Sequence, residues 1–399
     1  MSLGNPLVAP EPSRTQAPPA CVGARKLGIC HVASGDLWAG AEVQVATLLR
    51  ELVKRPDLEL SAILLNEGRL ADELRECGVE VVVIPESTTS FPRLFWQAAH
   101  YLGTRRVRIL HSHRYKENLL AWLMARRCGV PVVIRTQHGL PEPFPGFKHL
   151  KQRALQSLDG LVARYGTTRV ITVSREMHSA LTGSWDGSRL VTIPNGLELA
   201  RVTSRLTREQ AKKALGVSSD SPLVGTVGRL EPVKRFDIFL AAAKHILATW
   251  PEARFAIVGT GSQEARLRAL AEETGIGGRV LFLGFRVDIY DVLRAFDVYL
   301  MCSDHEGLPT ALLEALQLGL PVVARPVGGV AEVVQDGVHA VLVPGADPCV
   351  LAAACSRLLG DADLRKLLAA NGPVRAGDFS SERTAATLFQ LYCTLAGET

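Results

Sequence analysis

Residues 303–316 read Ser-Asp-His-Glu-Gly-Leu-Pro-Thr-Ala-Leu-Leu-Glu-Ala-Leu and join a predicted strand to a predicted helix. The apolar run 298–301 before it predicts a buried strand, and a helix is predicted to open at Pro309 and to end at Gly319, because proline favours the first helical turn and glycine the position beyond the last. Glu306 stands between strand and helix, at the edge where open α/β sheets bind ligands. Free N–H groups at a helix start attract anions, so an acid there suits a ligand group that is attached to a phosphate.

Short apolar, β-branched runs of the same kind alternate with helical patterns along the chain. Continuous rather than alternating apolarity predicts strands that are buried on both faces, as in parallel sheets covered by helices. The predicted strands span 27–33, 60–65, 79–84, 107–111, 131–136, 169–173, 190–193, 223–227, 254–258, 280–283, 297–301, 321–324 and 339–343. Strand–helix repetition through both halves predicts an α/β protein with two doubly wound, Rossmann-like domains.

The chain is long enough for two domains, because 399 residues exceed the size at which a single core usually divides. Residues 1–25 are rich in Pro, Ala and Ser and predict a disordered leader. An N-terminal domain is expected over 26–200 and a C-terminal domain over 201–379. An amphipathic helix at about 380–399 has no strand after it, so it is free to pack elsewhere.

The composition is that of a soluble globular protein, with 47% hydrophobic and 21% charged residues. No apolar run approaches the ~20 residues of a membrane-spanning helix. The eight cysteines are scattered and form no C-x-x-C pair. That pattern predicts reduced thiols in the cytoplasm rather than a disulfide framework or a zinc site.

The positive charge of the chain is concentrated in residues 93–176, which hold 15 Lys or Arg against four acids. This stretch is either a solvated basic surface or a face that meets an anionic partner, such as a phosphate-bearing lipid or a membrane surface. No basic-aromatic recognition motif accompanies the charge, so nucleic acid is not an expected partner.

Two glycine-rich turns resemble phosphate-binding loops only in part. Gly35 and Gly40 have P-loop spacing, but Ala41-Glu42 replaces the Lys-Ser/Thr pair, which excludes a P-loop ATPase. The turn is therefore either a simple tight turn or a place where backbone approaches a phosphate or sugar. Residues 259–261 lack the third glycine of a dinucleotide fingerprint, since Glu264 stands there, and a hairpin-like turn or a helix entry is the preferred interpretation.

Three histidines follow predicted strands. His111 is interpreted as a structural residue, whereas His138 precedes a Pro/Gly-rich loop and is expected to project from the sheet edge into a cleft. No clustered ligand spacing supports a metal site, so no metal is expected. Asp361-Ala-Asp363 has the form of a cation motif, but it precedes a helix and is interpreted as a cap.

Arg229 and Lys234 follow the predicted strand 223–227, just before a helix. A rigid Arg fork and a compact Lys charge at the ligand edge of a parallel sheet favour a diphosphate site over plain surface charge.

Taken together, the chain from about residue 26 resembles the retaining glycosyltransferases of the GT-B type, specifically family 4 (group 1), whose E-x7-E signature corresponds to Glu306 and Glu314. Several motifs stand in the order of that family. They are Gly40-Ala41-Glu42, His138-Gly139, Val173-Ser174, Ile193-Pro194-Asn195-Gly196, Gly228-Arg229-Leu230 with Lys234, Gly284-Phe285, Glu306-Gly307 with Pro309, and Glu314-Ala315. Three positions depart from the usual pattern, namely Ala39, Leu308 and Arg235.

The resemblance implies two parallel sheets that face a central cleft, with the final helix packed back on the first domain. It implies that Arg229 and Lys234 hold the diphosphate of a nucleotide-sugar, and that Glu314 binds the ribose. It implies that Glu306 and His138 contact the transferred sugar, with Gly307 and Leu308 nearby. It also implies that Gly40 approaches the phosphate and sugar and, more loosely, that Phe285 and Arg286 contact the base. The catalytic set expected in this way is His138, Glu306, Arg229 and Lys234, with no metal and no other cofactor.

The expected function is therefore that of a retaining hexosyltransferase (EC 2.4) that uses a nucleotide-sugar donor and a glycan or lipid-linked acceptor in the synthesis of a cell-surface polysaccharide or glycolipid. The expected location is the cytoplasm, with peripheral attachment to the inner face of the membrane through residues 93–176. Two alternatives stay open, namely a non-catalytic nucleotide- or glycan-binding protein and a sugar-nucleotide epimerase of the same fold.

Overall fold

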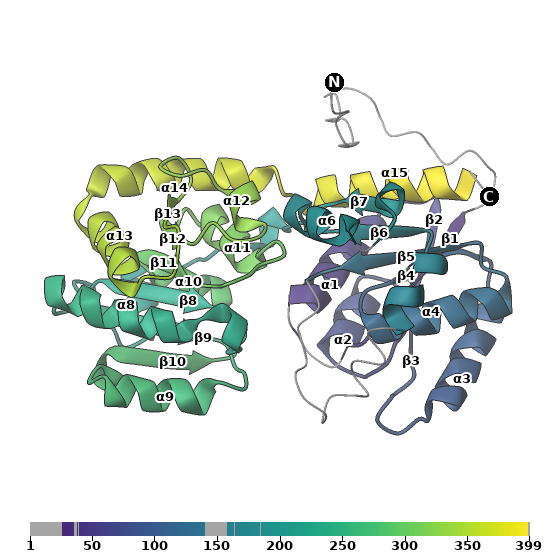
Figure 1. The fold of residues 1–399 in the computed structure, drawn as a ribbon, viewed down its shortest axis with the longest axis horizontal. Coiled ribbons are helices and arrows are strands. Elements are labelled where there is room, and N and C mark those ends of the chain that lie inside the picture. The colour runs from purple at the N-terminus through teal and green to yellow at the C-terminus, as the bar shows by residue number, and fades with distance from the viewer. Residues whose placement is uncertain are drawn as a thin grey trace. The chain divides into compact units, whose positions relative to one another are not determined.

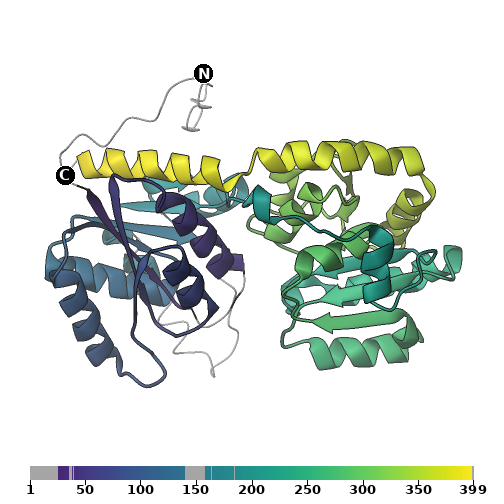
Figure 2. The ribbon, with the colours of Figure 1, turned by 180° about the vertical axis from the view of Figure 1, so that it is seen from behind.

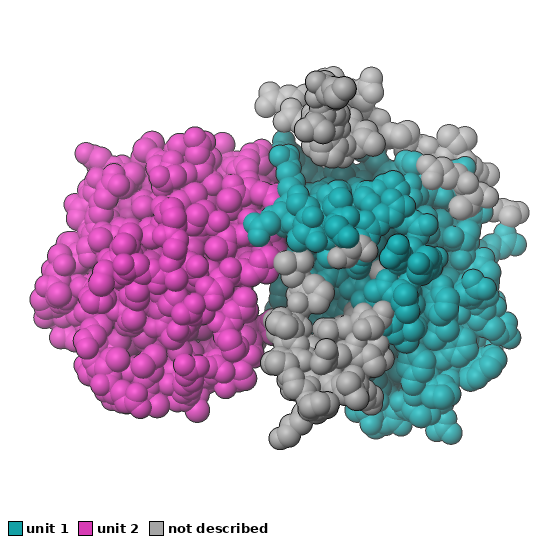
Figure 3. All heavy atoms as spheres, in the orientation of Figure 1, with its two compact units in different colours: residues 1–196, 381–399 teal, residues 197–380 magenta. Residues whose placement is uncertain are grey.

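The computed structural model describes residues 26–35, 38, 40–139, 158–162, 164–183 and 185–397. The leader expected over 1–25 lies outside the described residues. The chain divides into two compact units (Figure 3), the first made of Met1–Gly196 with Ser381–Thr399 and the second of Leu197–Ser380.

Unit 1 contains a seven-stranded parallel sheet in the order β3-β2-β1-β4-β5-β6-β7. Its strands are β1 (Leu27–Ala33), β2 (Leu58–Leu64), β3 (Glu80–Val83), β4 (Val107–Ser112), β5 (Val132–Gln137), β6 (Arg169–Thr172) and β7 (Leu190–Thr192). Its helices are α1 (Gly40–Leu52), α2 (Arg69–Glu76), α3 (Phe91–Gly103), α4 (Tyr115–Cys128), α6 (Arg175–Thr182) and α15 (Ser381–Gly397), with a short 3-10 turn at Gly187–Arg189.

Helices cover both faces of this sheet, as the opposite views of Figures 1 and 2 show. One apolar cluster joins the sheet to α1, α2 and α15, and a second joins it to α3 and α4. Leu388, Phe389 and Tyr392 of α15 belong to the first cluster and are at most 2% exposed. The final helix is therefore part of the unit 1 core, although unit 2 separates it from the rest of unit 1 in sequence.

Unit 2 contains a six-stranded parallel sheet in the order β10-β9-β8-β11-β12-β13. Its strands are β8 (Leu223–Val227), β9 (Arg254–Val258), β10 (Val280–Gly284), β11 (Val298–Met301), β12 (Val322–Ala324) and β13 (Val341–Leu342). Its helices are α7 (Arg208–Ala214), α8 (Phe236–Thr249), α9 (Glu264–Glu273), α10 (Ile289–Ala295), α11 (Thr310–Gln317), α12 (Val330–Val333), α13 (Pro348–Gly360) and α14 (Ala362–Gly377), and 3-10 turns lie at Leu199–Arg201, Pro232–Lys234 and Gly277–Arg279.

The two parallel sheets confirm the predicted α/β class, because every strand pair in both sheets is parallel and every strand sits near its predicted position. Two helix details are also settled. Asp361 accepts a hydrogen bond from the Leu364 N–H and so caps α14, as expected. Pro309 occupies the N-cap of α11 rather than its first turn, because α11 begins at Thr310.

The cysteines depart from expectation at one position. Cys30, Cys77, Cys128, Cys302, Cys349 and Cys355 are free thiols, whereas Cys393 in α15 is disulfide-bonded. The expectation of reduced thiols is therefore wrong for Cys393, because a bond formed by folding needs no spacing pattern in the sequence. Among the described residues, none of the helices combines the length and the apolarity that crossing a bilayer requires.

Candidate functional site

The unit 2 site lies where the strand order reverses. Strand β8 pairs with β9 on one side and with β11 on the other, so β9 and β10 extend the sheet toward one edge and β11, β12 and β13 extend it toward the other. Such a switch point opens a crevice at the carboxyl ends of parallel strands. Arg229 and Lys234 follow β8, while Ser303 and Glu306 follow β11. The sequence-predicted phosphate and sugar residues thus belong to the two strands that flank the crevice.

Lys234 and Glu306 form an ion pair across this switch point. The Lys234 ammonium lies 2.7 and 2.8 Å from the two carboxylate oxygens of Glu306. The Ser303 hydroxyl donates to Oε1 of the same carboxylate at 2.6 Å. Glu306 is only 7% exposed, so its charge needs these partners. The sequence predicted that both residues bind the donor, but it did not predict that they bind each other or that Ser303 joins them.

Arg229 is exposed in the segment between β8 and the 3-10 turn Pro232–Lys234. The loop is supported from behind by residues 259–261. A Cβ on Gly259, which has φ +127°, would lie 2.0 Å from the Gly228 carbonyl oxygen, and the Leu230 N–H donates to the Thr260 carbonyl at 2.9 Å. Residues 259–261, which precede α9, therefore hold the Arg229 loop in position.

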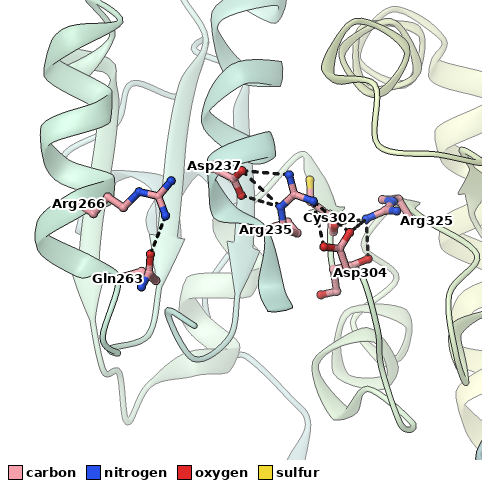
Figure 4. A network of polar contacts seen from close by, with 8 residues as sticks. Arg235, Asp237, Gln263, Arg266, Cys302, Asp304 and Arg325 are labelled. Atoms are coloured by element: carbon pink, nitrogen blue, oxygen red, sulfur yellow. Dashed lines mark hydrogen bonds and ion pairs between the residues drawn. The ribbon is translucent and has the colours of Figure 1, made fainter. Parts of the chain in front are cut away.

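Arg235 occupies a backbone conformation that favours glycine, with φ 50°. Its guanidinium lies between two carboxylates, 3.0 Å from Asp237 and 2.9 Å from Asp304 (Figure 4). Arg325 binds Asp304 from the other side at 2.5 Å and also donates to the Cys302 carbonyl. Partial burial favours a higher pKa for Asp304, but the hydrogen bonds from Arg325 and Arg235 outweigh it and lower the pKa. Arg235 thus ties the loop after β11 to α8.

The turn that carries Glu306 and Gly307 is backed by two glycines that the sequence reading missed. The Gly329 N–H donates to the Gly307 carbonyl at 3.0 Å. A Cβ on Gly328 would lie 1.8 Å from the Glu306 carbonyl oxygen, and one on Gly329 would lie 2.0 Å from the Gly307 oxygen. Adjacent glycines after a buried strand were the available signal. Leu308, next in the turn, is 4% exposed and packs inward.

Glu314 lies in α11, a turn after the Glu306 loop. Burial of its carboxyl group raises the pKa to about 7. The side chain therefore exchanges its proton near neutral pH. A carboxylate of this kind gains from hydroxyl donors, because they replace the water that burial removed.

Phe285 and Arg286 follow β10 on the far side of β9 from β8. The Phe285 ring is 52% exposed. Arg286 donates to Asp288 at 2.7 and 2.5 Å, which raises the pKa of the Arg286 guanidinium. The structure places both residues at the same sheet edge as Arg229, but their described contacts do not include the Lys234–Glu306 pair.

Unit 1 brings its own candidate residues to the carboxyl edge of its sheet. Gly40 begins α1 after β1, is exposed, and has no atom within 4 Å of an added Cβ. Glu42, in the same turn, is 3% exposed and bonds the Arg114 guanidinium at 2.5 Å. The first glycine-rich turn thus meets the residue that follows His113 at the end of β4.

His138 follows β5 and is held on one side. Its Nε2 lies 3.2 Å from Nδ1 of His113, whereas its buried Nδ1 has no partner among the residues that the structure describes. Burial lowers the pKa of His138 to about 4, so the ring is neutral at physiological pH. Burial also lowers the pKa of His113.

A second buried network, absent from the sequence prediction, holds the strand that leads to His138. Arg135 is 4% exposed and donates to Asp159 and to Gln137 at 2.5 Å each. Gln137 in turn donates its amide N–H to the Gly139 carbonyl. The backbone on both sides of His138 is thereby fixed by charged and amide side chains.

The sequence matches known glycosyltransferase families over most of its length. Residues 207–375 match the family described as glycosyl transferases group 1, and residues 39–196 match the glycosyl transferase 4-like domain. A D-inositol 3-phosphate glycosyltransferase of Actinosynnema mirum is 31% identical over 398 residues, which cover 93% of this chain and 92% of the relative. The UDP-Gal:alpha-D-GlcNAc-diphosphoundecaprenol alpha-1,3-galactosyltransferase of Escherichia coli is 29% identical over 315 residues, 76% of this chain and 80% of the relative.

Solved structures share the fold at lower identity. The Anabaena protein HepE in complex with UDP and glucose superposes with a TM-score of 0.81 at 20% identity, over 92% of this chain and 99% of that one. Sucrose-phosphate synthase from Thermosynechococcus elongatus superposes with a TM-score of 0.78 at 20% identity, over 94% and 100%.

Proposed function

The chain belongs to the group 1 glycosyltransferases, with the GT-B fold, and on that premise we propose that it moves a hexose from a nucleotide-diphosphate-sugar to a glycan or lipid-linked acceptor with retention of anomeric configuration. The product is a cell-surface polysaccharide or glycolipid, made in the cytoplasm at the inner face of the membrane. HepE, which shares the fold, was solved with UDP-glucose, and this supports a uridine diphosphate sugar as the first donor to test.

One observation carries the proposal, namely the convergence of Lys234, Glu306 and Ser303 at the unit 2 switch point. A diphosphate bound there draws the Lys234 ammonium by charge and meets the Arg229 fork on the exposed loop. Glu306 then turns from Lys234 to the hydroxyls of the transferred sugar. Glu314 accepts hydrogen bonds from the ribose, and Phe285 with Arg286 borders the base.

The proposed reaction uses that arrangement. The bond between the anomeric carbon and the phosphate oxygen breaks, and a bond to the acceptor oxygen forms on the same face. The departing phosphate oxygen takes the acceptor proton, so no protein base is needed, and attack on the same face needs no protein nucleophile. Glu306, already bonded to Lys234 and Ser303, suits orientation of the sugar. Lys234 and Arg229 stabilise the charge that develops on the leaving diphosphate, so the proposed chemistry calls for no metal ion.

Mutations at the switch point test this function. Lys234→Met, Arg229→Met and Glu306→Gln are each expected to lower kcat/KM for sugar transfer by about 100-fold or more, measured by release of nucleoside diphosphate with an acceptor panel. Lys366→Met is the control, since Lys366 is 80% exposed on α14. Transfer is expected to persist in EDTA, and NMR of the product reports the anomeric configuration. Wild-type rates in the Lys234 and Glu306 variants refute the site, and an isomerised donor sugar without acceptor shows an epimerase instead.

The basic stretch of unit 1 suggests how the enzyme meets its acceptor. Trp96 on α3 is 56% exposed, and Phe91 at the start of the same helix is 47% exposed. The Arg127 guanidinium, from the last turn of α4, lies 5.5 Å from the Trp96 ring centre. Aromatic rings beside arginines bind the headgroup region of anionic bilayers. Residues 140–157 of the expected basic face, including Lys148, Lys151 and Arg153, lie outside the described residues.

Vesicle co-sedimentation tests this surface. Vesicles with phosphatidylglycerol are expected to bind the protein at low salt and to release it at high salt, because exposed charges are screened. Trp96→Ser and Arg127→Glu are expected to weaken binding several-fold, whereas Arg266→Glu on α9 serves as the charge-matched control. Equal binding to neutral vesicles, or binding that both variants leave unchanged, contradicts the proposal.

A further inference from the structure

Five buried side chains of unit 1 and the half-buried His138 form one continuous hydrogen-bonded chain, which we call the histidine chain. Nε2 of His111 meets the Thr136 hydroxyl at 2.7 Å, and its Nδ1 meets the Tyr392 hydroxyl at 2.5 Å. Tyr392 meets Nε2 of His31 at 3.3 Å, and Nδ1 of His31 meets Nε2 of His113 at 3.0 Å. The last link joins His113 to His138. Thr136, His111, Tyr392, His31, His113 and His138 are its members.

The chain is drawn together from four elements that are far apart in sequence. His31 lies in β1, His111 and His113 at the end of β4, Thr136 in β5 just before His138, and Tyr392 in α15. His31 and His111 are register partners on neighbouring strands. Tyr392 is fully buried, so the final helix supplies the phenol that joins the two strand histidines.

The geometry favours hydrogen bonds over a bound metal. His31, His111 and His113 offer ligand atoms that all lie within 4.8 Å of one another. The ring centres of His31 and His113 are 5.3 Å apart, their facing nitrogens are 3.0 Å apart, and the ring planes are tilted by 17°. The distance between the centres exceeds the distance between the nitrogens by about two ring radii. The two nitrogens therefore point at each other along the line that joins the ring centres. A metal held at ~2.0 Å from each nitrogen does not fit on that line.

Proton counting sets the direction of the chain. Burial lowers the pKa of all four rings, so each neutral ring carries one N–H and one lone pair. Each ring-to-ring link must then pair an N–H with a lone pair. At Tyr392 both neighbours can donate to the phenol oxygen, but that arrangement leaves the buried Tyr392 hydrogen without an acceptor, so a single sense along the chain satisfies the most groups. Only two uniform orders exist, one with all four rings protonated at Nδ1 and one with all four protonated at Nε2.

Thr136 decides between these two orders. If its hydroxyl donates to His111, each donor within the chain is satisfied and only the Nδ1–H of His138 still needs a partner. In the reverse order the Thr136 hydrogen has no acceptor among the described residues, and His138 Nδ1 also lacks a partner. Leaving a second buried polar group unsatisfied is unfavourable, so the order that starts at Thr136 is preferred.

We propose that the histidine chain holds His138 as the Nδ1–H tautomer, so that its outer nitrogen donates a hydrogen bond to a substrate oxygen at the carboxyl edge of the unit 1 sheet. Thr136, His111, Tyr392, His31 and His113 are positioning residues in this assignment. The identity of the oxygen, a hydroxyl of the transferred sugar, rests on the proposed function. His138 so held is a donor rather than a general base, since its outer nitrogen already bears a proton.

NMR of the full-length, ligand-free protein tests the chain directly. Two-bond proton–nitrogen correlations distinguish the two tautomers of each neutral ring. We expect His31, His111, His113 and His138 all to be protonated at Nδ1 at pH 7. Rings protonated at Nε2, a charged ring among the four, or a stoichiometric transition metal in the purified protein would overturn the proposal.

Substitutions at Thr136 distinguish its effect on the direction of the hydrogen bonds from its effect on packing. Thr136→Val removes the hydroxyl at constant shape and is expected to give mixed tautomers at His138, with a roughly tenfold loss of kcat/KM. Thr136→Ser keeps the hydroxyl and is expected to restore both. Tyr392→Phe is expected to mix the tautomers of His31, His113 and His138, whereas Leu388→Ala, which also removes a buried α15 contact, is not. Unchanged His138 tautomers in Thr136→Val would overturn the assignment.

The two proposals fail in different ways. Four Nδ1–H rings in a protein that transfers no sugar from any nucleotide-sugar would refute the proposed function and support the chain. Full transfer activity with His138 protonated at Nε2 would refute the chain and support the proposed function.

Discussion

Glu314 shows how one half-buried carboxyl group links the site to pH. Its pKa is raised to about 7 by burial, against an ordinary 4.5. The folded protein therefore binds more protons than the unfolded chain between those values, and this contribution to stability is lost as the pH rises through about 7. Ribose hydroxyls that donate to the carboxylate favour the ionised form, so donor binding and folding stability respond to pH in opposite directions.

We therefore expect the Kd for a uridine diphosphate sugar to fall about tenfold between pH 6 and pH 8, as the fraction of ionised Glu314 rises. Isothermal titration calorimetry at several pH values measures it. Glu314→Gln is the control, which should bind more weakly at pH 8 and lose most of the dependence. A pH dependence that survives in Glu314→Gln assigns the titration to another group.

Arg235 holds a left-handed backbone conformation at φ 50°, where glycine is unstrained. Arg235→Ala keeps the strain and loses the ion pairs to Asp237 and Asp304, whereas Arg235→Gly loses only the ion pairs. We expect Arg235→Gly to be more stable than Arg235→Ala by about 1 kcal/mol, measured by urea denaturation. Equal stability of the two variants would mean that the loop relaxes away from this conformation when the ion pairs are gone.

At the same scale, the sequence identified the chemical residues but not their partners. Arg229, Lys234 and Glu306 follow strands and carry charges, so a strand-end search finds them. The Lys234–Glu306 pair joins residues 72 positions apart, and the histidine chain joins residues up to 361 apart. Such contacts depend on strand order and on where α15 packs. Neither leaves a local pattern, so His31 and Tyr392 went unnoticed.

At the scale of elements, the loop after β12 sets the position of the Glu306 turn. Gly328→Ala places a methyl group 1.8 Å from the Glu306 carbonyl oxygen at φ +55°, whereas Gly337→Ala meets no atom within 4 Å at φ +70°. Both variants place an alanine in a left-handed backbone conformation and are strained, but only Gly328→Ala must also displace the Glu306 turn. We expect Gly328→Ala to lose donor affinity at least tenfold and Gly337→Ala to keep it, by calorimetry. Similar losses in both would show that strain alone is responsible.

The strands were predicted well because a strand that is buried on both faces has a continuous run of apolar residues. The expected strand at 27–33 coincides with β1, and those at 223–227 and 254–258 coincide with β8 and β9. The boundaries shifted by a residue or two where apolar side chains continue past the last ladder bond, as at 339–343, where β13 spans only Val341–Leu342. The glycine turn at 259–261 was harder to interpret, since its role is to support a loop from another strand.

At the scale of the whole molecule, unit 2 is formed by one continuous segment of the sequence, whereas unit 1 is formed by two separate segments. Unit 2 is a continuous segment, Leu197–Ser380, with its own apolar core. Unit 1 needs both the N-terminal segment and α15, whose Leu388, Phe389 and Tyr392 fill its core. The proposed donor residues Arg229, Lys234, Glu306 and Glu314 all belong to unit 2, whereas His138 and the histidine chain belong to unit 1.

This division predicts which fragments fold and what they bind. We expect residues 197–380, produced alone, to fold cooperatively and to bind UDP, because core and donor contacts lie within one segment, but to transfer no sugar. Residues 1–196 alone should not fold stably, since removal of α15 exposes apolar side chains that each contribute roughly 1.5–3 kcal/mol when buried. Circular dichroism and calorimetry measure both, and adding a peptide of residues 381–399 should rescue the second fragment. A folded 197–380 fragment that does not bind UDP would show that the donor contacts require unit 1.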